Sequence, residues 1–255
     1  DHLLRAAAVH GSRLAVVDGP LRLTYAQLLD DCLRQAGALA GLGVRPGDRV
    51  AVLAPNSSLL LRMHYSVPMA GGVLVALNTR LAAPELATIV AHSGARIAIV
   101  DETLLEKASD LLVPVLSEAE FGVLAESSPP LSVPVSDELA LVSINYTSGT
   151  TGRTKGVMYP HRGAYLQSVA MAYHMGLGPD SVYLWTVPMF HCNGWTFPWA
   201  VVAAGGTQVC SRKVVPSETW RLIRVEGGNA LGGAPIVLAY MTRAHEAAPR
   251  PTRVT

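Results

Sequence analysis

Apolar residues along the first hundred positions change repeatedly between helical spacing and short uninterrupted runs. From Thr24, the residues TYAQ have the form of a capping box, and apolar side chains then recur at helical spacing until Gly41. Uninterrupted apolar runs rich in β-branched residues predict strands, and these runs are RVAVLA (49–54), VLVAL (73–77) and RIAIV (96–100). The helices predicted between them are 57–70 and the stretch from Pro84 to Gly94.

The same alternation returns after a polar, proline-rich segment, ESSPPLSVPVS (126–136). The strands predicted there are 139–145, VYLWTV (182–187) and TQVC (207–210), and the helices are 161–175, 217–225 and 235–247. Strands that alternate with helices and are apolar at every position are typical of parallel sheets covered on both faces. The pattern therefore predicts an α/β fold of two αβ lobes, 1–125 and 137–255, with largely parallel sheets and a surface linker at 126–136.

Composition narrows the class of protein. Half of the 255 residues are apolar, so the chain can bury a large core. The 20 basic and 19 acidic side chains nearly cancel, which argues against nucleic-acid binding. Three widely spaced cysteines are typical of a reducing compartment, so we expect a cytoplasmic protein. The apolar runs are far shorter than the roughly 20 residues that span a bilayer, and the first residues lack the apolar core of a signal peptide.

The segment YTSGTTGRTKG (146–156) follows a predicted strand and gathers hydroxyl groups and glycines around one lysine. In open α/β sheets such a loop lies at the carboxyl edge, where ligands bind. Hydroxyl groups and accessible backbone amides can surround phosphate oxygens while Lys155 offsets their charge, so we expect a phosphate-binding loop rather than a solvated turn. The predicted contacts are Thr147, Ser148, Gly149, Thr150, Thr151, Gly152 and Lys155.

A Walker A loop is disfavoured for this segment. Thr154 stands where its second glycine is required, and Gly156 stands where a Ser or Thr would bind magnesium.

A second segment, PMFHCNGWTFPW (188–199), gathers aromatic side chains in a chain that is only 6% aromatic. We expect Phe197 and Trp199 to belong to the core, and His191 and Trp195 to lie at a site. A Cys192/His191 nucleophile pair is disfavoured, because adjacent side chains rarely point at each other and no third orienting group is evident. Zinc is disfavoured because no second pair of ligands has suitable spacing.

The loop closely resembles the phosphate-binding signature of the adenylate-forming superfamily: acyl-CoA synthetases, luciferases and the adenylation domains of nonribosomal peptide synthetases. Thr154 departs from this signature, since the family usually has proline there. The other matching stretches are LTYAQL (23–28), MAGGVLVALNTRLAAPEL (69–86), DELALVSINYTSG (137–149) and PMFHCNGW (188–195). The resemblance covers essentially the whole chain and implies the α/β amino-terminal domain of an acyl-CoA synthetase.

The resemblance implies a two-step reaction that consumes ATP with Mg²⁺ and then coenzyme A. A carboxylate attacks the α-phosphorus of ATP, and the thiol of coenzyme A displaces AMP from the acyl-adenylate. Lys155 and His191 are the implied catalytic residues, Thr150 is an implied magnesium contact, and His191, Trp195 and Gly233 are implied at the acyl pocket. The PMFHCNGW stretch looks more like fatty-acyl or aryl-CoA synthetases than amino-acid-activating domains, and fatty-acyl members are often homodimers.

Several family motifs do not occur in residues 1–255. These are an aromatic-Gly-x-Thr-Glu motif, a ribose-binding aspartate, and a hinge leading to a carboxy-terminal domain with a catalytic lysine. We therefore expect about half of an enzyme, with the carboxy-terminal domain absent and little ligase activity in this chain alone. A non-catalytic module that binds nucleotide phosphate or acyl groups stays open, as does an unrelated phosphotransferase, which the Walker mismatch disfavours.

Overall fold

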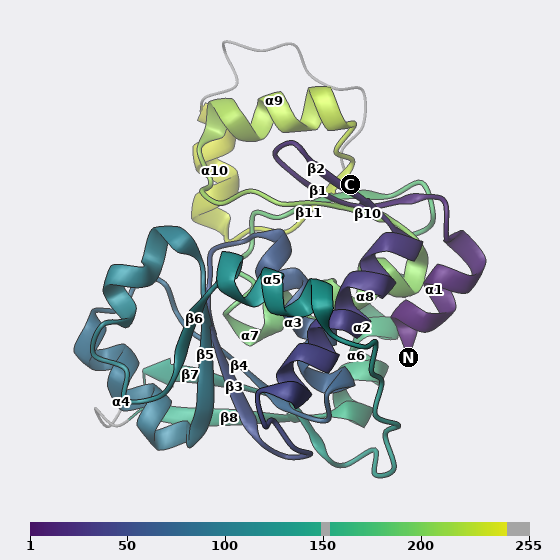
Figure 1. The fold of residues 1–255 in the computed structure, drawn as a ribbon. Coiled ribbons are helices and arrows are strands. Elements are labelled where there is room, and N and C mark those ends of the chain that lie inside the picture. The colour runs from purple at the N-terminus through teal and green to yellow at the C-terminus, as the bar shows by residue number, and fades with distance from the viewer. Residues whose placement is uncertain (149–153, 244–255) are drawn as a thin grey trace.

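The computed structural model describes residues 1–148 and 154–243, which form two sheets covered by helices (Figure 1). The six-stranded sheet has the order β6-β5-β3-β4-β7-β8 and consists of β3 (Arg49–Leu53), β4 (Val73–Ala76), β5 (Ala95–Val100), β6 (Val115–Ser117), β7 (Leu141–Ser148) and β8 (Thr154–Pro160). The five-stranded sheet has the order β11-β9-β10-β1-β2 and consists of β1 (Leu14–Asp18), β2 (Leu21–Thr24), β9 (Val182–Leu184), β10 (Thr207–Val209) and β11 (Ala230–Leu231).

Six of the described helices lie where the sequence predicts them, and the other five have no counterpart among the predicted elements. The described helices are α1 (His2–His10), α2 (Tyr25–Gly41), α3 (Ser58–Met69), α4 (Ala83–Ser93), the 3₁₀ helix η1 (Glu102–Ala108), α5 (Glu118–Ser127), α6 (His161–His174), α7 (Cys192–Trp195), α8 (Phe197–Ala204), α9 (Pro216–Glu226) and α10 (Pro235–Arg243). The predicted capping box is confirmed, because the Thr24 hydroxyl accepts from the Gln27 amide and the Gln27 side chain accepts from the Thr24 amide. Gly94 ends α4 with φ 64°, the left-handed conformation that glycine adopts without strain.

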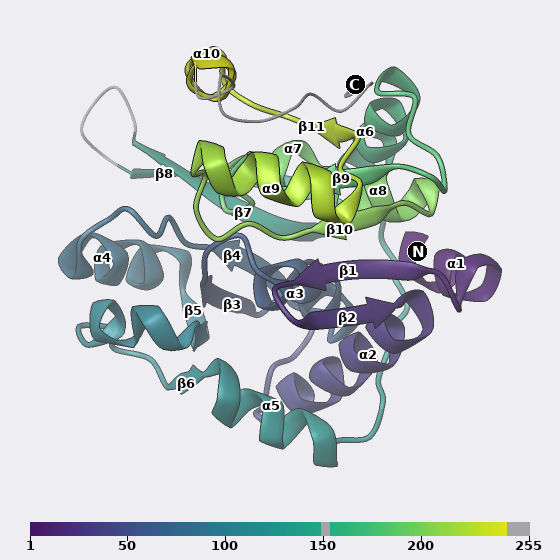
Figure 2. The same cartoon turned by 90° about the horizontal axis from the view of Figure 1, so that it is seen from above.

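Both sheets are largely parallel, as predicted from the uninterrupted apolar runs. Within the described residues only two pairs are antiparallel, β1 with β2 and β7 with β8. Helix α3 contacts β1 of one sheet and β3 and β4 of the other, and one hydrophobic core includes residues of both sheets (Figure 2). No helix in the described ranges is long and apolar enough to cross a membrane.

The structure differs from the expected division into lobes 1–125 and 137–255. Strands β1 and β2 join β9, β10 and β11, whereas β7 and β8 join β4, so each sheet takes strands from both sides of the expected linker. Residues 128–136 do run as irregular chain, but the Leu131 amide donates to the Leu33 carbonyl and the Val133 amide to the Met69 carbonyl. Apolar runs reveal strands but not their partners, which are chosen by packing over long sequence separations.

The predicted phosphate loop 146–156 includes the last residues of β7 and the first residues of β8, and these two strands pair with each other. Strand β7 continues to Ser148 and pairs with β8, a strand that the sequence did not reveal, with Thr147 opposite Lys155 and Tyr146 opposite Gly156. A Cβ on Gly156 would lie 2.9 Å from Ile144 Cγ2, so the strand pairing favours glycine there. Residues rich in glycine and hydroxyl groups resemble a turn, which is why β8 was missed.

Candidate active site

A cleft of about 1190 Å³ lies where loops from both sheets meet. Its lining comes from the chain just after the carboxyl ends of β3, β4, β5, β9 and β10, and from the chain that begins at the end of β11. Ligands of parallel α/β sheets bind at this edge, because the strand ends and the loops that follow them converge there. A smaller hollow of about 530 Å³, lined by His64, Tyr65 and Arg162 among others, contains none of the predicted site residues.

The cleft brings together three of the predicted site residues. His191 and Trp195 line it from the segment after β9, and Gly233 lines it from the segment after β11. Phe197 and Trp199 are buried in the core, as the sequence analysis expected, although Phe197 also reaches the cleft. The Thr186 hydroxyl donates to the Gly232 carbonyl, which ties the two wall segments together.

The predicted phosphate contacts that the structure describes lie on β7 and β8, and they do not line the cleft. Lys155 is exposed on β8 and Thr147 is half-buried on β7. Ser148 is the last residue of β7, opposite Thr154. The remaining predicted contacts lie outside the described residues, and these are Gly149, Thr150, Thr151 and Gly152.

The electrostatic character of the cleft is basic. Arg80, Arg212 and Lys213 line it together with His191, and its described lining contains no carboxylate. Arg212 Nη1 donates to the buried Asp101 carboxylate at 2.9 Å, which holds the guanidinium at the cleft wall. Such a surface favours anionic ligands.

His191 and Cys192 do approach each other, contrary to expectation, with 3.8 Å between His191 Nε2 and Cys192 Sγ. Among the described residues, no carboxylate hydrogen-bonds to the His191 imidazole to orient it. Within the same residues, no group of three or more His, Cys, Asp or Glu is placed to hold a metal ion. Thr150, the magnesium contact that the resemblance implies, lies outside the described residues.

Three asparagines that the sequence analysis did not select support the segment carrying His191 and Trp195. Asn56 Oδ1 accepts from the Met189 amide at 2.8 Å, and Asn56 Nδ2 donates to the Val187 carbonyl at 2.9 Å. Asn145 Nδ2 donates to the Phe190 carbonyl at 2.9 Å. The third, Asn193, donates from Nδ2 to a hydroxyl on β7 at 2.8 Å. The only sequence signal for this role was an asparagine close after a predicted strand, as in LAPN, where Pro55 separates Asn56 from the strand 49–54.

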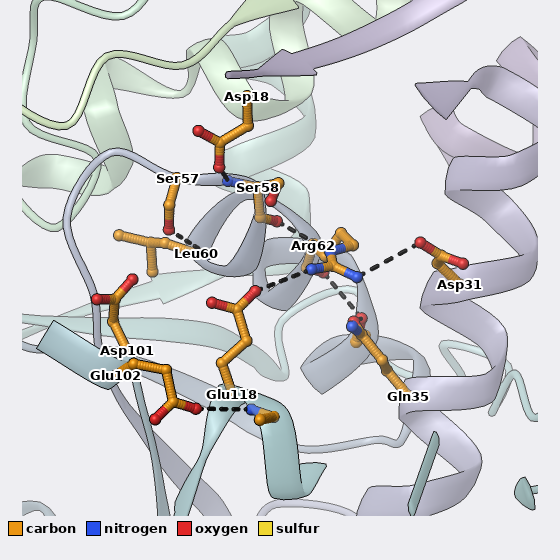
Figure 3. Close-up of polar contacts among 12 residues, drawn as sticks. Asp18, Asp31, Gln35, Ser57, Ser58, Leu60, Arg62, Asp101, Glu102 and Glu118 are labelled. Atoms are coloured by element: carbon orange, nitrogen blue, oxygen red, sulfur yellow. Dashed lines mark hydrogen bonds and ion pairs between the residues drawn. The ribbon is translucent and has the colours of Figure 1, made fainter. Parts of the chain in front are cut away.

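A second polar network lies between α2, α3 and α5 (Figure 3). Arg62 donates to Glu118 at 3.1 Å, to Asp31 at 3.4 Å and to the Ser58 carbonyl at 3.1 Å. Asp18, at the end of β1, accepts from the Ser58 amide at 2.8 Å and so joins the other sheet to the start of α3. Burial raises the pKa of the Glu118 and Asp31 carboxyls, while Arg62 opposes that shift. None of these five residues lines the cleft.

The chain is similar to a known protein family and to individual enzymes. The family model described as AMP-binding enzyme matches residues 3–253. A benzoate–CoA ligase from Arabidopsis thaliana is 36% identical over 94% of this chain and 47% of its own length. A 4-hydroxybutyrate–CoA ligase from Metallosphaera sedula is 38% identical over 94% of this chain and 49% of its own length. The chain thus spans about half the length of these relatives.

Solved structures agree with the fold. The inhibitor-bound amino-terminal domain of FACL13 from Mycobacterium tuberculosis superposes with a TM-score of 0.89 at 28% identity, covering 96% of this chain and 65% of that one.

Proposed function

Because the chain belongs to the family of AMP-binding enzymes, we propose that its parent protein is an AMP-forming acid–thiol ligase. The carboxylate of an organic acid attacks the α-phosphorus of ATP, pyrophosphate leaves, and the thiol of coenzyme A then displaces AMP to form the thioester. The observation that carries the proposal is the meeting of His191, Trp195 and Gly233 in one basic cleft at the carboxyl edge of both sheets.

We assign the phosphate contacts to the end of β7, the start of β8 and the residues that separate them in the sequence. Lys155 is an exposed cation on β8, and it offsets the charge of the β- and γ-phosphates. The remaining contacts are Thr147, Ser148, Gly149, Thr150, Thr151 and Gly152. Mg²⁺ supplies further charge neutralisation, with Thr150 as its proposed contact in this chain.

The acid is assigned to the apolar part of the cleft. Met171, Phe190 and Trp195 line it beside His191, so an apolar fatty or aryl acid fits its wall better than an amino acid does. Gly233 leaves room near the wall, since even a Cβ there would come 3.2 Å from Leu238 Cδ2. The basic side chains at the cleft suit the phosphates of ATP and coenzyme A.

Residues 1–255 are assigned to a single partial adenylation domain, because both sheets exchange strands across the expected linker 126–136.

A cytoplasmic location is proposed because all three cysteines are free and two are buried. A homodimer is proposed from the family resemblance alone, and size-exclusion chromatography with light scattering tests it.

ATP–pyrophosphate exchange by the parent protein, with fatty and aryl acids as substrates, tests the function. We expect exchange that depends on the acid, and a fall of about 100-fold in kcat/KM for Lys155→Ala, because a charge at the transition state is lost. Arg224→Ala removes an exposed cation of α9 and is the charge control. Exchange without any acid dependence, or an unchanged rate in Lys155→Ala, contradicts the assignment.

The 255-residue chain is the second arm of this experiment. We expect it to support little exchange by itself, because it spans about half the length of the relatives. The alternative, a non-catalytic module, predicts phosphate or acyl binding by both proteins and exchange by neither.

A further inference from the structure

The turn that carries Trp195 has a left-handed backbone at five consecutive residues. The φ angles are 50° at Cys192, 50° at Asn193, 53° at Gly194, 58° at Trp195 and 66° at Thr196. Only one of the five is glycine, and each L-residue in this conformation costs roughly 1–2 kcal/mol. A run of this kind persists only where the surrounding structure imposes it.

Two close contacts hold the turn in place. The Asn193 side chain is fully buried and donates from Nδ2 to the Ser143 hydroxyl of β7 at 2.8 Å. Gly194 packs against the Trp185 ring so closely that a Cβ would lie 2.5 Å from a ring carbon. Asparagine is also among the residues that best tolerate the left-handed region, so Asn193 suits the backbone as well as the hydrogen bond.

Strand β7 also holds the chain just before the turn. Ser143 and Asn145 are two positions apart and therefore project from the same face of the strand. Asn145 donates to the Phe190 carbonyl, one residue before His191. The strand thus determines the positions of the chain on either side of His191.

The consequence is visible in the exposure of the aromatic side chains. Trp195 is 60% exposed and lines the cleft, whereas Phe197 and Trp199 are 3% and 7% exposed. A right-handed turn would direct the Trp195 Cβ differently, because the sign of φ sets where Cβ points.

We propose that Asn193, through its hydrogen bond to Ser143, is a positioning residue that keeps this turn left-handed and holds Trp195 at the cleft. Asn193 Oδ1 and Asn145 Oδ1 are both buried and have no hydrogen-bond partner within the described residues. Each unpaired buried oxygen lowers the stability of the fold. The geometry of the turn therefore explains the positions of the two amides better than a gain in stability does. The kinetic part of the proposal rests on the proposed function, whereas the structural part does not.

Tryptophan fluorescence tests the structural part. Of the four tryptophans in the chain, Trp195 is the only one with an exposed side chain. Acrylamide quenching of the parent protein, minus that of its Trp195→Phe variant, therefore reports the environment of this side chain. We expect Asn193→Ala to change the Trp195 quenching constant at least twofold, and Ser143→Ala to change it in the same direction.

Two further variants separate positioning from stability. Asn193→Gly removes the hydrogen bond but keeps a residue at ease in the left-handed region, so its quenching constant should lie between wild type and Asn193→Ala. Ser66→Ala removes a buried serine hydrogen bond of 2.7 Å to Gln35 of α2, which involves neither the turn nor β7. It should lower thermal stability about as much as Ser143→Ala and leave Trp195 quenching unchanged.

Kinetics provide the second measurement. We expect Asn193→Ala to raise KM for the acid about tenfold and KM for ATP less than twofold. If the wild-type protein shows no acid-dependent exchange, the proposed function fails while the quenching result still decides the role of Asn193. Wild-type quenching in both Asn193→Ala and Ser143→Ala, or an equal change in Ser66→Ala, overturns the proposal.

Discussion

The molecule contains two polar networks that differ in kind. The Arg62 network joins α2, α3 and α5 through charged side chains, and its helices have regular backbone (Figure 3). The asparagine network of Asn56, Asn145 and Asn193 is neutral, supports a left-handed turn and includes two buried oxygens without partners among the described residues. Only the asparagine network adjoins the cleft.

The difference indicates which network serves the fold and which serves the site. A half-buried arginine must be paired, since an unpaired buried charge is strongly destabilising. A buried amide with an unpaired oxygen lowers the stability of the fold, and a strained backbone does so as well. Folded proteins keep such features where they hold a functional arrangement of side chains in place. We therefore expect variants of the first network to change mainly stability, and variants of the second to change the cleft as well.

The largest effect is expected at Arg62. Arg62→Met keeps much of the side-chain volume but leaves Glu118 and Asp31 without their shared partner, and should lower the free energy of unfolding by about 3–5 kcal/mol. Urea denaturation measures this. Arg34→Met breaks the exposed pair with Asp30 and serves as the control, with an expected loss below about 1 kcal/mol. Equal losses in the two variants would show that the Arg62 pairs are no more important than surface pairs.

A smaller effect is expected at Asn56. Asn56→Ala leaves the buried Met189 amide and the Val187 carbonyl without partners and should destabilise the fold by about 2–3 kcal/mol. It should also change Trp195 quenching, because the segment leading to the turn loses its support. Asn78→Ala, which removes a more exposed hydrogen bond to the Arg80 amide, is the matched control. Loss of stability without any change in quenching would place Asn56 with the structural network.

The smallest effect is expected at Glu118, and it depends on pH. Burial raises the pKa of this carboxyl in the folded state above its ordinary value of 4.5, so the folded protein binds this proton more tightly than the unfolded chain does. Relative to Glu118→Gln, wild type should therefore gain stability as the pH falls from 7 towards 4.5. At pH 7 the two should differ by less than about 1 kcal/mol.

Urea titrations of wild type and Glu118→Gln at several pH values test that sign. A wild type that loses stability relative to the variant on acidification would mean that Arg62 dominates and that the pKa of Glu118 is lowered. Asn193→Ala involves no titrating group, so its stability difference from wild type should stay constant over the same range.

The helices and strands that the sequence predicts have local signals, whereas elements such as β1, β2, β6, β11, α1 and α5 were not predicted. The capping box at Thr24, the stop at Gly94 and the apolar run 73–77 depend on residues a few positions apart. Strand β8 could not be predicted, since Lys155 and Gly156 are not typical strand residues and pair only because β7 is their neighbour. Helix boundaries, capping and the α/β class were therefore accessible from sequence, and sheet membership was not.

At the site, the residue types could be identified from the sequence, and the family resemblance selected His191, Trp195 and Gly233 among them. The fold explains why they line one cleft: His191 and Trp195 follow β9, Gly233 follows β11, and these two strands are neighbours in one sheet. Only the tertiary structure revealed the left-handed turn at Asn193. Its handedness is imposed by Ser143, fifty residues away in the chain, and no local propensity encodes a contact of that range.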